Sequence, residues 1–170
     1  MSFTSIAYPD EKSARYTLLL EQTRALTDGV SHPIANLANV AALLYQALPD
    51  INWCGFYLMD KGALMLGPFC GLPACIRIPL GRGVCGTAAK SDEIQRVYDV
   101  HQFPGHIACD SASNSEIVIP LHFGGSVIGV LDIDSPTIGR FDETDQENLL
   151  SIVKHLERCC CFEHTLYTLD

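Results

Sequence analysis

Long apolar runs and basic residues are both scarce in this chain of 170 residues. No stretch approaches the roughly twenty apolar residues of a membrane helix. The start, Met-Ser-Phe-Thr-Ser, has neither the basic patch nor the apolar run of a signal peptide. Only 11 Lys and Arg accompany 20 Asp and Glu, and the formal charge of -9 repels nucleic acid and anionic membranes. We therefore expect a cytoplasmic protein. A small polar molecule remains a possible ligand.

Metal-site spacing is absent as well, because none of the eight cysteines forms a Cys-x-x-Cys pair. A structural metal is therefore not expected. In a cytosol that keeps thiols reduced, irregularly spaced cysteines are typical of catalytic or buried thiols rather than of permanent disulfides. The eight are Cys54, Cys70, Cys75, Cys85, Cys109, Cys159, Cys160 and Cys161.

The length and the apolar content of 48% fit one globular domain that spans residues 1–170. Amphipathic helices are expected over 11–27 and 33–48, with Ser31 as the cap of the second and Pro33 at its start. From residue 52 the pattern changes to short β-branched and aromatic runs, which predict strands. These runs cover 53–59, 64–66, 76–78, 94–98, 116–123 and 126–133.

Two further helices and a hairpin complete the prediction. A short helix is expected near Gly83. Asp142, with Asp145 three residues later, resembles an N-terminal cap, and apolar residues then recur at helical spacing. The run His-Phe-Gly-Gly-Ser at 122–126 indicates an antiparallel hairpin.

The expected fold class is α+β. Helices from residues 1–50 and 140–168 are expected to pack on one face of a central antiparallel sheet of about six strands. The sheet and the active-site loops take up residues 51–136. Because strands do not alternate with helices, a doubly wound sheet is not expected.

Three cysteines stand beside Gly, Pro, Asp and Ser, the residues of turns and loops where a sulfur can be reached. They are Cys75 in Gly-Leu-Pro-Ala-Cys, Cys85 in Gly-Val-Cys-Gly-Thr and Cys109 in His-Ile-Ala-Cys-Asp-Ser. Cys109 lies within residues 99–115, a segment too long and polar for a simple connection, which we expect to cap a ligand pocket. The plainer interpretation is a surface loop that happens to hold a cysteine.

Acidic residues gather at neighbouring strand ends. Asp132 and Asp134, in Leu-Asp-Ile-Asp-Ser-Pro, share one face of a strand by its period of two, and Glu116 opens the preceding strand. In the plain interpretation they are solvated or cap the loop at Pro136. In the functional one they bind an ammonium group, or share a proton because their repulsion raises one pKa.

Five stretches carry motifs of a known family: Asn-Trp-Cys-Gly-Phe-Tyr-Leu at 52–58, Leu-Gly-Pro-Phe-Cys-Gly-Leu-Pro-Ala-Cys at 66–75, Gly-Val-Cys-Gly-Thr-Ala-Ala at 83–89, a run containing Phe-Pro-Gly-His-Ile-Ala-Cys-Asp-Ser at 99–118, and Gly-Val-Leu-Asp-Ile-Asp-Ser-Pro at 129–136. Through them the chain closely resembles the free methionine-(R)-sulfoxide reductases, a branch of the GAF-domain fold. The three cysteines joined to the run around Cys109 make the resemblance specific. One departure is Cys70, where the family pattern has glutamine, and this adds a fourth thiol that we expect close to the site.

The resemblance implies reduction of free L-methionine-(R)-sulfoxide, with Cys109 as the attacking thiolate. Cys75 is then the first choice for the thiol that resolves the sulfenic acid into a disulfide, and Cys85 the second. No tightly bound cofactor is implied. Electrons come from thioredoxin, which NADPH keeps reduced through thioredoxin reductase, and a homodimer is implied.

The leaving oxygen needs a proton and the substrate ammonium needs a carboxylate, so Glu116, Asp132 and Asp134 are candidates for both roles. Trp53 and Tyr57, on one face of a strand, are expected to form the apolar wall for the methyl-sulfinyl group. Their alternative is ordinary core packing.

The remaining cysteines, Cys54 and Cys159 to Cys161, are interpreted as structural, as are His32, His122, His155 and His164. The alternative function is a GAF module that senses a small ligand or oxidant without turnover. The sequence shows no output domain, which favours the enzyme. A peroxidase-like thiol enzyme is a third alternative.

Overall fold

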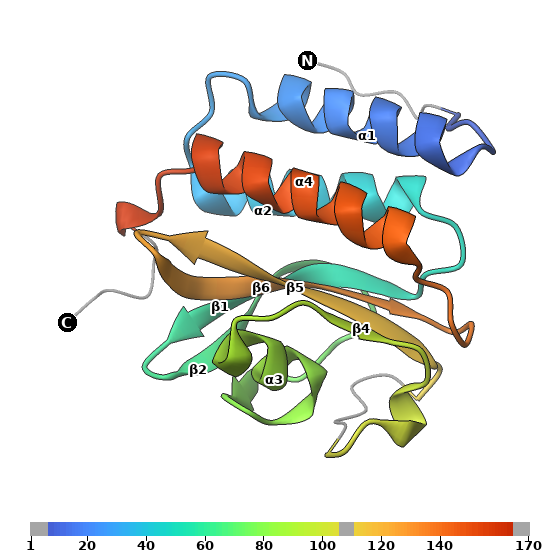
Figure 1. Ribbon diagram of the computed structural model, residues 1–170. Helices are drawn as coiled ribbons and strands as arrows, with labels where there is room; N and C mark the ends of the chain where they lie inside the picture. Colours follow the sequence, from blue (N-terminus) through green and yellow to red (C-terminus); the bar gives the residue numbers. More distant parts are fainter. Residues whose placement is uncertain (1–6, 106–110, 165–170) are drawn as a thin grey trace.

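The computed structural model describes residues 7–105 and 111–164, which form a six-stranded antiparallel sheet with helices on both faces (Figure 1). The strands lie in the order β3-β2-β1-β6-β5-β4. They are β1 (Trp53–Asp60), β2 (Ala63–Gly71), β3 (Arg77–Pro79), β4 (Gln95–Val97), β5 (Ser115–Phe123) and β6 (Ser126–Ser135). The helices are α1 (Lys12–Thr27), α2 (Pro33–Ala47), α3 (Gly83–Ser91) and α4 (Glu143–Cys159), with short 3-10 turns η1 (Val100–Gln102) and η2 (Phe162–His164).

The helices are divided unequally between the two faces of the sheet. Helices α2 and α4 cover one face, α1 lies outside them, and α3 covers the opposite face (Figure 1). The predicted α+β class and the packing of the N- and C-terminal helices on one face are therefore confirmed. The predicted hairpin joins β5 to β6, and Gly124 and Gly125 at its tip both have positive φ, as a type I′ turn requires.

Each face of the sheet has its own apolar core. Phe56 and Leu131 point toward α2 and α4 and are fully buried there. Tyr57 and Val130, the next residue along in β1 and the preceding one in β6, point the other way and pack against Val84 of α3. Because side chains alternate along β1 and β6, one face of the sheet packs against α2 and α4, and the other packs against α3 and its neighbours.

Strand β2 is longer than predicted, because it continues past Leu66 to Gly71. Gly67 and Pro68 appear in the sequence as strand breakers. The register with β1 shifts between Gly55 and Tyr57, so this Gly-Pro pair falls where β2 bulges. A bulge tolerates both residue types, and the strand resumes beyond it.

The predicted cap of α2 is wrong by one residue. His32, not Ser31, is the N-cap, and its Nδ1 accepts the backbone N-H of Ala35 at 3.3 Å. Because Pro33 occupies the first helical position, the residue directly before it takes the cap conformation. The backbone oxygen of Ser31 instead accepts the N-H of Cys161 beyond α4.

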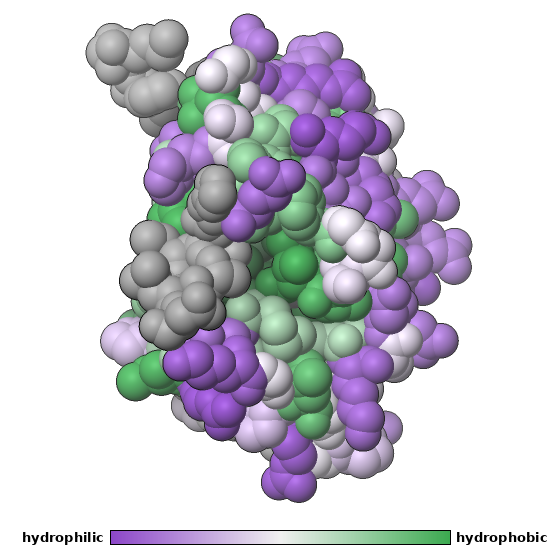
Figure 2. All heavy atoms as spheres, turned by 90° about the vertical axis from the view of Figure 1, so that its left-hand side faces the viewer, coloured by the Kyte–Doolittle hydropathy of each residue, from purple (hydrophilic) through white to green (hydrophobic). Residues whose placement is uncertain are grey.

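Apolar side chains reach the surface in limited areas. Figure 2 shows the end of the molecule at the left of Figure 1, where apolar side chains gather in a central hollow and hydrophilic ones surround it. Within residues 7–105 and 111–164, every helix is too short or too polar to cross a membrane.

A buried carboxylate, Asp145, ties the helix layers together. Its side chain accepts hydrogen bonds from Tyr16 Oη at 2.7 Å, Lys12 Nζ at 2.9 Å and Arg140 Nη1 at 3.1 Å. It also completes the predicted capping box, because Asp142 and Asp145 each accept the other's backbone N-H. One side chain therefore connects α1, the loop after β6 and the start of α4.

Replacing Asp145 with alanine should lower the free energy of unfolding by about 3 to 5 kcal/mol, because Arg140 and Tyr16 would lose a buried acceptor. Urea denaturation measures the change. Glu143→Ala, in the same helical turn but with an 85% exposed side chain, is the control and should cost under about 1 kcal/mol. Equal losses in the two variants would contradict the role given to Asp145.

Candidate active site

Three acidic side chains meet on the sheet face that α3 covers. Glu116 lies on β5, and Asp132 and Asp134 lie on β6, where they share a face as their spacing of two residues requires. Glu116 stands directly opposite Asp134 in the ladder. The three residues are only 6%, 6% and 9% exposed. Carboxylates are seldom buried to this extent without a functional or pairing reason, and three together mark a candidate site.

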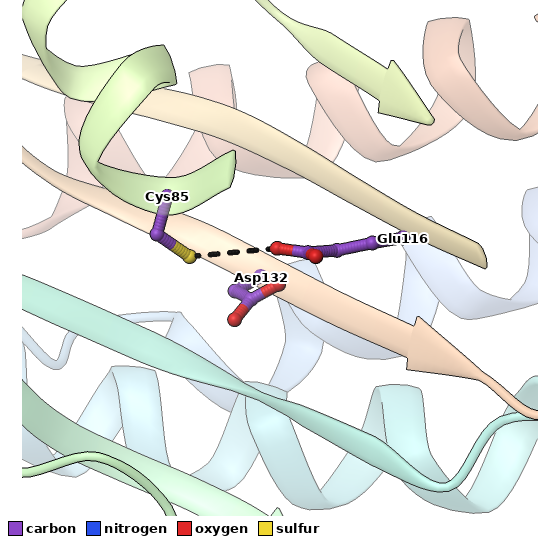
Figure 3. A group of neighbouring side chains, drawn as sticks. All are labelled: Cys85, Glu116 and Asp132. Atoms are coloured by element: carbon purple, nitrogen blue, oxygen red, sulfur yellow. Dashed lines mark hydrogen bonds between the residues drawn. The ribbon is translucent and has the colours of Figure 1, made fainter. Parts of the chain in front are cut away.

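Cys85 of α3 completes a compact group with two of these carboxylates (Figure 3). Its Sγ donates a hydrogen bond to Glu116 Oε1 at 3.8 Å. Cys85, Glu116 and Asp132 each present an atom within 4.8 Å of the other two. Figure 3 shows these side chains converging from α3, β5 and β6, elements that the fold brings together from distant parts of the sequence.

The buried carboxylates share a proton. Burial, and then the charges of Asp132 and Asp134, raise the pKa of Glu116 well above its ordinary value. Burial also raises the pKa of Asp132 to about 6, although hydrogen bonds with Cys85 and Glu116 oppose this shift. Of the two groups, Glu116 therefore holds a proton more readily than Asp132.

One oxygen of the group has no donor. Asp132 Oδ1 is buried and lacks a hydrogen-bond partner among the described residues. An unpaired, buried carboxylate oxygen costs free energy. A cationic or N-H group of a ligand would relieve that cost.

Aromatic rings form a wall beside the carboxylates. Trp53 and Tyr57 point to the same face of β1 as predicted, and their stacked rings have centroids 5.8 Å apart. Phe69 of β2 stacks on the other side of Trp53 at 5.4 Å, and the indole N-H donates to the backbone oxygen of Leu72 at 3.1 Å. Sequence reasoning missed Phe69 and the Leu72 carbonyl, although both lie within the motif at 66–75.

Gly55 allows this wall to form. It lies between Trp53 and Tyr57 on the same face of β1, and a Cβ there would come within 2.7 Å of the Trp53 ring and closer still to Phe69 Cβ. Any larger residue would therefore push the two rings off the strand. The bulge that follows Gly55 in the pairing of β1 with β2 lies at the same place.

Cys85 is not in an open loop, so the expectation of an easily reached sulfur is wrong for this residue. It lies in the first turn of α3, is 5% exposed, and burial raises the pKa of its thiol well above the ordinary value. Gly86 brings α3 close to the chain before it, because a Cβ at this position would clash with the backbone oxygen of Pro79. The short helix expected near Gly83 is confirmed, and Cys85 is packed into its first turn.

Cys75 is in the environment that the sequence predicts. It lies between β2 and β3, is partly exposed, and packs at the edge of the apolar cluster that contains Trp53 and Cys85. Cys70 lies elsewhere. The strand register places it directly opposite Cys54, whose side chain belongs to the core under α2 and α4. Cys70 therefore shares the face away from the carboxylates, and the expectation of a fourth thiol at the site is wrong.

Cys109, the predicted nucleophile, lies outside the described residues. The ends of its segment are described. Val97, the last residue of β4, stands opposite Glu116, and the chain re-enters the sheet at Ser115. Before that strand, Ser113 Oγ accepts a hydrogen bond from Asn52 Nδ2 at 3.0 Å, which ties the segment to the start of β1. Both ends of the segment therefore adjoin the carboxylate group.

His122 and the three cysteines at the end of α4 lie away from this group. His122 bridges Asp92, the C-cap of α3, at 2.6 Å and Glu157 of α4 at 2.9 Å, which fits its structural interpretation. Cys159, Cys160 and Cys161 follow one another at the end of α4 and are half-buried, buried and exposed. They do not form one pocket, which agrees with the expectation that three successive side chains of a helix point in different directions.

A metal ion could use Cys85, Glu116 and Asp132 as ligands, because their atoms are close enough. Such an ion would have to displace the proton that Glu116 and Asp132 share. No histidine belongs to this group within the described ranges. The expectation that the protein uses no metal stays a prediction.

Comparison with known proteins gives consistent matches. The GAF domain model matches residues 35–158. The chain is 54% identical to the free methionine-R-sulfoxide reductase of Escherichia coli (strain K12) over 147 residues, which cover 86% of this chain and 89% of that protein. It is 42% identical to the protein of the same name from Saccharomyces cerevisiae over 85% of each chain. The X-ray structure of free methionine-R-sulfoxide reductase from Neisseria meningitidis in complex with its substrate superposes with a TM-score of 0.87 at 44% identity, covering 93% of this chain and 95% of that one.

The raised pKa of Asp132 predicts an unusual pH dependence of stability. Because the folded-state pKa of about 6 lies above the ordinary 3.8, folding favours the protonated form, and stability falls as pH rises from about 4 through 6. Asp132→Asn should remove this fall. At pH 7 the free energy of unfolding of the variant should exceed that of the wild type by about 1 to 3 kcal/mol. At pH 4 the two free energies should be similar.

Asp142→Asn is the contrasting control for urea titrations across this range. Lys12 holds the pKa of Asp142 down at about 2, so its ionised form favours folding and the neutral variant should be less stable at pH 7. An Asp132→Asn variant less stable than the wild type at pH 7 would contradict the proton-sharing arrangement.

Proposed function

Because this chain belongs to the GAF-domain family, and within it to the free methionine-R-sulfoxide reductases, we propose that it reduces free L-methionine-(R)-sulfoxide to L-methionine. One observation carries the proposal: the Glu116 and Asp132 carboxyl groups lie together in a buried site on the same sheet face as the Trp53 and Tyr57 rings. A sulfoxide has an oxygen that must be protonated before it leaves and a methyl group that prefers an apolar wall. The site supplies both.

Cys109 is the nucleophile in this proposal. Its thiolate attacks the sulfoxide sulfur, and the oxygen passes to Cys109 as Glu116 supplies the proton. The products are L-methionine and a sulfenic acid on Cys109. Glu116 is the acid because burial and two neighbouring carboxylates raise its pKa well above the ordinary value. The start of the Cys109 segment opposite Glu116 supports this pairing of roles.

A second thiol then regenerates the enzyme. Cys75 condenses with the sulfenic acid, releases water and forms a disulfide with Cys109. Partial exposure and a place at the edge of the aromatic cluster favour Cys75 over buried Cys85, which remains the alternative. Reduced thioredoxin opens the disulfide by thiol exchange, and NADPH supplies the two electrons through thioredoxin reductase. This cycle needs a reducing compartment, which we propose is the cytoplasm, and no tightly bound cofactor.

The free amino acid is the proposed substrate because the site can neutralise a positive charge. Asp132 has a buried oxygen without a donor among the described residues, and Asp134 lies on the same face two residues away. An ammonium group offers three donors to such oxygens. In a peptide the same nitrogen is an uncharged amide and the chain continues beyond it. The Trp53 and Tyr57 rings then select the epimer by holding the methyl group.

Substrate selectivity tests the function directly. With dithiothreitol as reductant, the protein should turn over free L-methionine-(R)-sulfoxide repeatedly, as measured by amino-acid analysis of the methionine formed. The (S) epimer and an N-acetylated sulfoxide should react at least about a hundredfold more slowly, because one misplaces the oxygen and the other lacks the charge. A single stoichiometric burst of methionine would instead indicate a GAF redox sensor.

The thiol roles give a graded prediction. Cys109→Ser should abolish turnover, because serine cannot accept the oxygen. Cys75→Ser should permit one methionine per enzyme and then stop with dithiol proteins as reductant. Cys85→Ser should keep part of the steady-state rate. Rapid-quench measurement of methionine separates these cases, with Cys161→Ser as an exposed-thiol control that should match the wild type. An active Cys109→Ser enzyme would exclude this mechanism.

A further inference from the structure

The charges of this protein are distributed unevenly along the chain. Residues 61–91 contain no Asp or Glu and four basic residues, whereas the rest carries seven basic and all 20 acidic residues. The four are Lys61, Arg77, Arg82 and Lys90. All four are exposed, and none forms an ion pair with a carboxylate of the described chain. These four residues therefore carry positive charge that no carboxylate of the described residues pairs, in a protein that is otherwise strongly acidic.

Apolar side chains are exposed in the same region. Ile76 is 72% exposed, Leu72 is 62% exposed and Leu80 is 36% exposed. They lie on both sides of Cys75 and along β3, which is the edge strand of the sheet. An edge strand with exposed apolar and basic residues is a ready surface for another protein.

We propose that this β3 surface, formed by Leu72, Ile76, Arg77, Leu80 and Arg82, docks the reductant as an acidic protein that carries a reactive dithiol. The inference rests on the proposed function, since it assigns a place to its electron donor. Positive charge that no carboxylate of the described residues pairs favours an acidic partner, and exposed apolar side chains next to arginines are typical of protein interfaces. Cys75, within this surface, is the sulfur that the partner attacks.

The exchange balances as two thiol-disulfide steps. A thiolate of the partner attacks Cys75 Sγ, which forms a mixed disulfide and releases Cys109 as a thiolate. The second thiol of the partner attacks its own sulfur in the mixed disulfide, which releases the Cys75 thiolate and leaves the partner oxidised. Two electrons pass to the enzyme disulfide, and protons from solvent neutralise the thiolates.

The β3 surface is also linked to the proposed substrate site by a backbone hydrogen bond. The carbonyl oxygen of Leu72 accepts the indole N-H of Trp53, so the outer surface and the aromatic wall share one hydrogen bond. Leu66, in turn, donates its N-H to the oxygen of Ile76 at 2.9 Å, which holds the Cys75 turn against β2. The thiol is therefore presented on a supported turn rather than on a free loop.

Charge reversal separates docking from chemistry. Arg77→Glu/Arg82→Glu should raise the KM for a thioredoxin of acidic pI by roughly tenfold, because it removes the electrostatic attraction. The KM of the variant should also depend less on salt concentration, because salt weakens the attraction only in the wild type. With dithiothreitol, the same variant should keep the wild-type rate. Arg24→Glu, on α1 on the other side of the sheet, is the matched control and should leave both rates unchanged.

A trapping experiment tests the surface without any sulfoxide. A thioredoxin whose second active-site cysteine is serine should form a mixed disulfide at Cys75 of the peroxide-oxidised protein, as located by mass spectrometry. Ile76→Ser and the Arg77→Glu/Arg82→Glu variant should lower the yield several-fold. Trapping at another cysteine, or an unchanged yield in both variants, would overturn the proposal.

Self-association of the chain and failure of the reductase activity give different results in these experiments. If the variants change the sedimentation coefficient but neither the KM nor the trapping yield, the β3 surface joins two copies of this chain and the docking proposal is wrong. If the wild type fails to reduce the sulfoxide even with dithiothreitol, the proposed function fails, and trapping alone still decides whether the surface accepts a dithiol protein.

Discussion

Three carboxyl groups on one buried sheet face cannot all be ionised, and the chemistry of the molecule depends on this constraint. Strand register fixes Glu116 opposite Asp134 and places Asp132 two residues away, so their repulsion cannot be relieved by moving apart. The raised pKa of Glu116 and the Asp132 oxygen that lacks a partner among the described residues are two results of the same crowding. The general acid and the cation acceptor that we propose therefore depend on one arrangement.

The cost of this arrangement is offset elsewhere in the fold. The face toward α2 and α4 carries the larger apolar core, and Asp145 joins three elements of the outer helix layers through hydrogen bonds and ion pairs. Asp145 differs from the carboxylates of the site because cations surround it. Burial of charge thus stabilises one side of the molecule and is tolerated on the other for function.

Periodicity explains why much of the fold could be predicted. The common face of Asp132 and Asp134, the Trp53 and Tyr57 pair, the hairpin at 122–126 and the capping box at Asp142 all follow from local rules. Contacts between distant segments were not visible. The bulge that carries β2 through Gly67 and Pro68 depends on β1, and the burial of Cys85 depends on where α3 packs. The position of Cys70 followed only from strand pairing.

The pairing of Cys70 with Cys54 has a consequence for an oxidising cell. Thiols on opposite faces of a sheet cannot form a disulfide, because two sulfurs must come within about 2 Å to bond and the backbone lies between them. Cys54 and Cys70 face α2, while Cys75 and Cys85 belong to the α3 side. Cys75 or Cys85 could therefore not form a disulfide with Cys54 or Cys70 unless a strand moved, so the sheet keeps the two pairs of thiols chemically separate.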